Sequence, residues 1–107
     1  MRLDFYKKNM KRAAIIRNNS NYLLKTIQPS DQFISSLFSF NCVTEEQCYF
    51  IQRQRSKRDK NAEHLEIMRS LNETKFSKFV KYLRQTNQTD VARIVLKGGG
   101  SIYIFND

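Results

Sequence analysis

The chain contains almost no residues that interrupt helices. Its one proline is Pro29, and its three glycines are consecutive, at residues 98–100 near the C-terminus. Proline interrupts a helix because it lacks an amide hydrogen and clashes with the preceding turn, and glycine weakens a helix through its backbone entropy. The chain can therefore run in helices over nearly all of its 107 residues. We predict an all-α fold.

The spacing of the apolar residues divides the chain into six predicted helices. In the clearest of them, which starts near Phe76, the apolar residues occupy positions i, i+3, i+4 and i+7, as in an amphipathic helix. The first helix is expected to be long and to bend or break in the stretch 18–21, where Asn-Asn-Ser-Asn has poor helix propensity. Together the segments predict an antiparallel six-helix bundle over residues 4–97. The apolar residues of the five later helices are Phe33, Ile34, Leu37, Phe38 and Phe40; Cys48 and Ile51; Ala62, Leu65, Met68 and Leu71; Phe76, Phe79, Val80 and Leu83; and Val91, Ala92, Val95 and Leu96.

Helix-capping residues stand at several of the expected helix starts. Ser30 follows Pro29 and belongs to a residue type favoured as N-cap. Residues 44–47 (Thr-Glu-Glu-Gln) have the form of a capping box, in which each end residue satisfies a backbone amide of the other. A second box is predicted at residues 56–59 (Ser-Lys-Arg-Asp).

A single domain is expected, because 107 residues of which 40% are hydrophobic can bury a core. It should cover residues 1–97, followed by a Gly-rich hinge and a C-terminal tail over residues 98–107. The uncharged stretch 32–43 is too short and too polar to span a bilayer, and the N-terminus lacks the apolar core of a secretory signal. A cytoplasmic protein is expected, with Cys42 and Cys48 as reduced thiols.

Few residues are candidates for catalysis. His64 is the only histidine and lies one position from the apolar stripe of its helix, so it is expected at the surface or at the core boundary. A pair of Cys42 or Cys48 with His64 would have no orienting third group at recognisable spacing. Glu45 and Glu46 are adjacent rather than facing, and the glycines are not followed by the Lys and Ser or Thr of a phosphate-binding loop. Neither an enzyme nor a metal or cofactor site is expected.

Positive charge is the strongest functional signal in the sequence. The formal net charge is +9, and most of the excess lies in two basic clusters. Such clusters occur as solvated helix faces, as nucleic-acid-binding surfaces and as protein interfaces, and composition does not choose between the last two. Nucleic acid is less favoured, because the phenylalanines that could stack on bases are assigned to core stripes: Phe33, Phe38, Phe76 and Phe79. The clusters are Arg2, Lys7, Lys8, Lys11, Arg12, Arg17 and Lys25, and then Arg53, Arg55, Lys57, Arg58 and Lys60.

Three segments follow one another as the helices of a known domain do. Residues 33–44 form an apolar helix and a "Cys-Val-Thr" entry to the next one, and residues 51–62 carry Ile-Gln-Arg, Ser-Lys-Arg-Asp and Ala at a helix junction. Residues 76–92 read FSKFVKYLRQTNQTDVA. In this order the segments resemble a caspase recruitment domain (CARD), a six-helix member of the death-fold superfamily. The resemblance extends over residues 19–96.

The chain departs from the family pattern at two places. Asn87 stands at a usual glycine, and asparagine can adopt the same left-handed backbone. Ser35 and Ser36 stand where CARDs of the apoptosome-scaffold type carry an aspartate and a histidine, so the second helix is nearly uncharged. The chain therefore looks like the basic partner of a complementary pair.

The resemblance implies homotypic docking, in which a basic patch on the first and fourth helices of one CARD binds an acidic patch of another. The implied protein is an adaptor or decoy that docks the CARD of a caspase or of its activating scaffold in apoptotic or inflammatory signalling. Alternatives are the N-terminal prodomain fragment of an initiator caspase and a basic helical nucleic-acid-binding domain. The residues of the predicted basic patch are Arg53, Arg55, Lys57, Arg58, Arg17 and Lys25. An acidic counter-patch for self-association would comprise Asp31, Glu45 and Glu46, although the two glutamates also stabilise a helix start.

Overall fold

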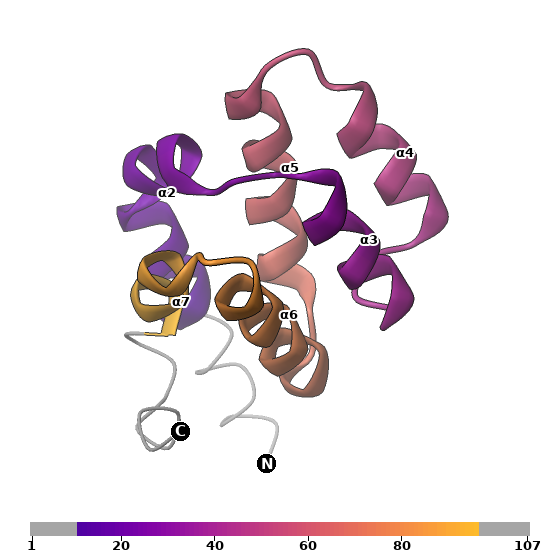
Figure 1. Ribbon diagram of the computed structural model, residues 1–107. Helices are drawn as coiled ribbons and strands as arrows, with labels where there is room; N and C mark the ends of the chain where they lie inside the picture. Colours follow the sequence, from indigo (N-terminus) through magenta and orange to yellow (C-terminus); the bar gives the residue numbers. More distant parts are fainter. Residues whose placement is uncertain (1–10, 97–107) are drawn as a thin grey trace.

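The computed structural model describes residues 11–96, and the regular elements over this range are α-helices (Figure 1). The all-α prediction is confirmed there, whereas the predicted hinge and tail over residues 98–107 lie outside the described residues. Residues 11–18 are helical and lead directly into the next helix. The helices that follow are α2 (Ser20–Thr26), α3 (Asp31–Ser39), α4 (Glu45–Arg53), α5 (Lys57–Ser70), α6 (Glu73–Gln85) and α7 (Thr89–Leu96).

Asn19 interrupts the first helix inside the stretch where the sequence predicts a bend or break. Its φ and ψ of −113° and 17° leave the helical region, and its side-chain amide donates to the Ile15 carbonyl at 2.8 Å. The Leu23 amide still donates to the Asn19 carbonyl at 2.9 Å, so the two helical segments stay in direct succession. A short polar side chain that bonds to nearby backbone competes with the helix in this way.

The predicted caps form at the starts of α3, α4 and α5. The Ser30 hydroxyl accepts from the Phe33 amide at 3.1 Å. At α4 the box is complete: Thr44 accepts from the Gln47 amide at 3.0 Å, and the Gln47 side chain accepts from the Thr44 amide at 2.7 Å. At α5 the Ser56 hydroxyl accepts from the backbone amide three residues later at 3.0 Å. Only the hydroxyl half of the second predicted box is present at this helix start.

Two asparagines in left-handed conformation end α3 and α6. Asn41 has φ of 62° and Asn87 has φ of 63°. After α6 the Asn87 amide donates to the Arg84 carbonyl at 3.2 Å and the Gln88 amide to the Leu83 carbonyl at 2.7 Å, which is a Schellman motif. Asparagine tolerates this backbone better than other residues with a side chain, so the expected left-handed role of Asn87 is confirmed.

Replacing Asn87 by alanine is therefore expected to lower the free energy of unfolding by about 1 kcal/mol, because a methyl group is strained in the left-handed region. Replacing it by glycine should leave stability equal or slightly higher. Urea unfolding followed by circular dichroism measures both variants. Equal stability of the alanine and glycine variants would contradict the role of backbone strain at this position.

Helix α5 lies at the centre of the packing. It packs against α2 on one side and α4 on the other, while α3 contacts α4 and α6, and α6 contacts α7 (Figure 1). The apolar stripe predicted for α6 is buried as expected. The largest fully buried apolar side chains are Phe33, Phe79, Ile16, Leu23, Ile27, Ile34, Leu37, Ile51, Met68, Leu83 and Val91.

Three residues that were predicted to belong to apolar stripes are exposed. Ala62 is exposed, and Asn61 and His64 take the buried positions beside Leu65 in α5. In an α-helix, each residue three positions further along lies about 60° around the helix axis from the one before. Four residues at this spacing therefore spread over about half of the circumference and cannot all lie on one buried face. Phe38 is 46% exposed, because α3 buries only the side that faces α4 and α6, and Phe40, the C-cap residue of α3, is 47% exposed.

Candidate interaction surface

The residues of the predicted basic patch are all exposed, and four of them meet where α4 leads into α5. Arg53 ends α4, Arg55 lies in the connecting loop, and Lys57 and Arg58 begin α5. We call these four residues the basic junction. None of them has an ion-pair partner among residues 11–96. Their charge is therefore available to an anionic partner.

Asn61 connects this junction to the end of α2. Its side-chain amide donates to the Leu24 carbonyl at 2.9 Å and to the Ile27 carbonyl at 2.8 Å. Lys25 lies between these two acceptors and is exposed, and Asn61 is one helical turn after Lys57. The hydrogen bonds bring Lys25 to the same end of the molecule as the basic junction. The role of Asn61 was not predicted from the sequence, although a polar residue on the buried face of a helix indicates a hydrogen bond to another element.

Arg17 is exposed but is not joined to the junction. It lies before the interruption at Asn19, more than two helical turns before Lys25. Within the described chain no hydrogen bond links it to α5. Of the two residues predicted from the first helix, only Lys25 is placed near the junction.

Arg12, which counts toward the N-terminal basic cluster in the sequence, is turned into the molecule. Its side chain is buried, and Nη1 donates to the carbonyls of Met68 at 3.0 Å and Leu71 at 2.5 Å. Nη2 forms an ion pair with Glu73 Oε2 at 3.0 Å. The guanidinium also lies 4.1 Å from the ring centre of Phe76. This charge stabilises the end of α5 and does not contribute to a docking surface.

The environment of Arg12 acts on its pKa in two directions. Burial lowers the pKa of the guanidinium, and the charge and hydrogen bond of Glu73 oppose that shift. Because an arginine pKa is very high, the group stays charged. The three hydrogen-bond acceptors compensate the buried guanidinium for its loss of hydration.

The acidic counter-patch is divided between two helix starts. Asp31 begins α3, and Glu45 and Glu46 lie in the first turn of α4, after the loop that follows the far end of α3. All three side chains are exposed. At these positions a carboxylate interacts favourably with the positive end of the helix dipole. Glu46 also lines a groove between α4 and α5.

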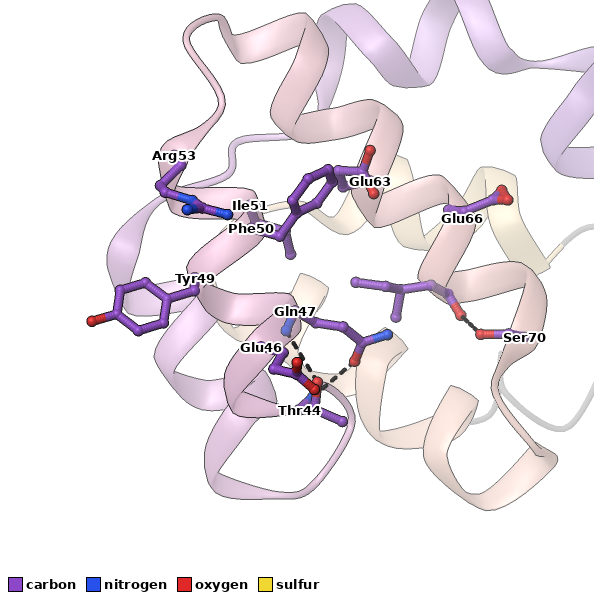
Figure 2. A pocket seen from close by; sticks show the side chains of 11 residues that line it. Thr44, Glu46, Gln47, Tyr49, Phe50, Ile51, Arg53, Glu63, Glu66 and Ser70 are labelled. Atoms are coloured by element: carbon purple, nitrogen blue, oxygen red, sulfur yellow. Dashed lines mark hydrogen bonds between the residues drawn. The ribbon is translucent and has the colours of Figure 1, made fainter.

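A groove runs between α4 and α5 (Figure 2). It has a volume of about 770 Å³. Its residues include three glutamates, one arginine of the basic junction and several apolar side chains. The groove was not predicted from the sequence. The sequence feature that could have indicated it is the aromatic pair Tyr49 and Phe50, which lies outside the predicted buried stripe of its helix and so leaves apolar surface exposed. The lining residues are Thr44, Glu46, Gln47, Tyr49, Phe50, Ile51, Arg53, Glu63, Glu66, Ile67 and Ser70.

His64 is buried, and the expectation of a surface or boundary position is wrong. Its side chain is 0% exposed and lies between the rings of Phe33 and Phe79, with centroid distances of 5.1 Å and 6.1 Å. Neither ring nitrogen has a hydrogen-bond partner in the described chain. Burial lowers the pKa of His64 to about 4, so the imidazole is neutral at physiological pH. A histidine enclosed in this way cannot reach a substrate in solution.

The two cysteines are free thiols. Burial raises the pKa of both Cys42 and Cys48, which favours the less nucleophilic thiol form. Within residues 11–96 no three side chains of His, Cys, Asp or Glu come together in the way metal ligands do. No helix of this range is long and apolar enough to cross a membrane.

No protein-family model matches the chain, and no curated protein sequence matches it either. The resemblance to the caspase recruitment domain therefore depends on the ordered motifs of the chain itself.

Proposed function

We propose that the chain is a CARD-type protein-interaction module that docks the CARD of a caspase or of a caspase-activating scaffold. The observation that carries this proposal is the basic junction, where Arg53, Arg55, Lys57 and Arg58 are exposed and without ion pairs in the described chain. The work of the protein would be recruitment in apoptotic or inflammatory signalling, as adaptor or decoy in the cytoplasm. No catalytic step is involved.

The succession of helices supports this proposal. The interrupted first helix and α2 together would count as the first helix of an antiparallel six-helix bundle, followed by α3 to α7. The junction between α4 and α5 then corresponds to the third-to-fourth helix junction in the resemblance. Asn87 has the left-handed backbone that the usual glycine would adopt. These are the features that a CARD would require of this sequence.

The chemistry of the junction favours a carboxylate-rich partner. Arginine can form two parallel hydrogen bonds with one carboxylate, which gives register as well as attraction. Clustered positive charge also increases the rate at which an acidic partner is captured. Once docked, the module would raise the local concentration of whatever is tethered to its partner.

Reversing the charge of Arg55 and Arg58 together to glutamate is expected to abolish capture of an acidic CARD, with a loss of affinity on the order of 100-fold. A pull-down against a panel of CARDs, followed by titration of the binder, measures the effect. The helical content should be unchanged, and the free energy of unfolding should stay within about 0.5 kcal/mol of that of the unmodified chain, because exposed charges contribute little to folding. A matched control is the reversal of Lys75 and Lys81, which are exposed on α6 away from the junction.

Two results would contradict the proposal. If the Arg55 and Arg58 reversal unfolds the domain, these residues are structural and the site is wrong. If no CARD binds while arbitrary duplex DNA binds with an affinity that falls steeply with added salt, the junction contacts phosphates and the chain is a nucleic-acid-binding protein.

A further inference from the structure

The groove between α4 and α5 differs in charge from the protein as a whole. Its lining contains the carboxylates of Glu46, Glu63 and Glu66 against a single guanidinium, that of Arg53. The chain carries a net charge of +9. The groove is therefore a local concentration of negative charge on a basic protein.

Two of the three carboxylates are available to a ligand. Glu66 is paired with Arg69, whose Nη2 lies 2.5 Å from Glu66 Oε1. Neither Glu46 nor Glu63 has an ion-pair partner within residues 11–96. Glu46 extends from the start of α4 and Glu63 from α5, on different sides of the groove (Figure 2). A cationic side chain in the groove would meet carboxylates from both helices.

The groove also has an apolar base. Ile51 and Ile67 line it and are buried, so they form its floor. Phe50 lines the groove and is 45% exposed, whereas the ring of Tyr49 points away (Figure 2). An apolar floor bordered by an exposed aromatic ring and a polar rim is the arrangement of an interface pocket that receives an apolar side chain.

We propose that this groove binds a cationic amphipathic helix of a partner protein. Apolar side chains of that helix would contact Ile51, Ile67 and Phe50, and flanking lysines or arginines would approach Glu46 and Glu63. Helices bind grooves in this way through anchors spaced at i, i+3, i+4 and i+7. The site adjoins the docking surface proposed above, because Arg53 belongs to both, but it binds its ligand through carboxylates and an apolar floor rather than through the positive charge of the basic junction.

The basic junction of a second copy is a poor occupant of the groove. The basic stretch that includes the junction, residues 52–60, reads QRQRSKRDK and contains no apolar side chain to reach the floor. The groove combines negative charge with an apolar base, so its ligand must combine positive charge with apolar anchors. The junction of a second copy lacks that combination, whereas a cationic amphipathic helix of a partner supplies it.

The test uses the 107-residue chain and a synthetic amphipathic peptide of about 14 leucine and lysine residues, with leucine at helical spacing. Fluorescence anisotropy of the labelled peptide at physiological salt measures binding. A second peptide, in which every lysine is replaced by glutamate, controls for charge. The lysine peptide is expected to bind in the groove despite the net positive charge of the chain.

Variants of the groove locate the binding site. The double change Glu46→Gln and Glu63→Gln is expected to weaken binding of the lysine peptide about tenfold. Glu45→Gln is the matched control, because Glu45 is exposed in the same helical turn but does not line the groove. Phe50→Ala should weaken binding about tenfold, whereas Tyr22→Ala, at a similarly exposed ring on α2, should not.

Three results would overturn the proposal. The first is equal affinity of the unmodified chain and both groove variants for the lysine peptide. The second is binding of the glutamate peptide to the unmodified chain that the groove variants weaken. The third is a dimer, detected by analytical ultracentrifugation without peptide, that the double glutamine variant abolishes, because this would assign the groove to a second copy. Circular dichroism of each variant separates loss of binding from loss of fold.

Discussion

Replacing Arg12 by alanine is expected to lower the free energy of unfolding by about 2–4 kcal/mol, because it leaves two buried backbone carbonyls without a donor, each at a cost of about 1–3 kcal/mol. The carbonyls of Met68 and Leu71 would lose their donor, and these belong to the end of α5, where carbonyls lack helical partners. The contact with the ring of Phe76 and the ion pair with Glu73 are lost as well. Urea unfolding followed by the helical circular dichroism signal measures the change.

Arg17→Ala is the matched control for this loss. Arg17 is exposed on the same helical segment, so its removal should change stability by no more than about 0.5 kcal/mol. Arg12→Lys should recover only part of the stability, because an ammonium cannot reproduce the planar fork of a guanidinium toward three acceptors. A loss below about 1 kcal/mol for Arg12→Ala would show that the network contributes little to folding.

Lowering the pH from 6.5 to 4 is expected to destabilise the domain through His64 by about 3 kcal/mol, since each unit of pKa shift corresponds to about 1.4 kcal/mol. The pKa of the side chain is about 4 in the folded state and 6.5 as the ordinary value. Between these values the unfolded chain binds a proton that the folded chain does not. Stability is therefore fully present above pH 6.5 and is lost as the pH falls toward the folded pKa.

His64→Leu isolates this contribution. Leucine has a similar volume and no polar atoms, so the variant avoids both the buried unpaired nitrogens and the protonation. It is expected to be more stable than the unmodified chain at neutral pH, and the difference should widen as the pH falls. Unfolding measured at several pH values tests this, because titration of the exposed carboxylates is common to both proteins. Parallel pH profiles would contradict the role of His64.

The local elements of the fold could be predicted from the sequence alone. The Thr44–Gln47 box, the Ser30 cap, the apolar stripe of α6 and the left-handed Asn87 each depend on residues within about four positions along the chain. The exposure of the basic junction was predictable for the same reason, because a charged stretch without apolar residues has nothing to bury. These interactions form wherever the helix forms, regardless of its neighbours.

The tertiary structure decided which residues each helix turns toward the core. Arg12 is buried because the carbonyls at the end of α5 lie opposite it, about 56 residues away in sequence. Asn61 faces inward because the end of α2 packs against α5 and supplies two carbonyls as acceptors for its side chain. His64 faces inward because the ring of Phe33 in α3 packs against it, whereas Ala62 is turned to solvent. The groove exists only where α4 and α5 are held side by side. Spacing along the chain predicts that a helix has an inner face, but burial of a given side chain depends on the distant elements packed against it.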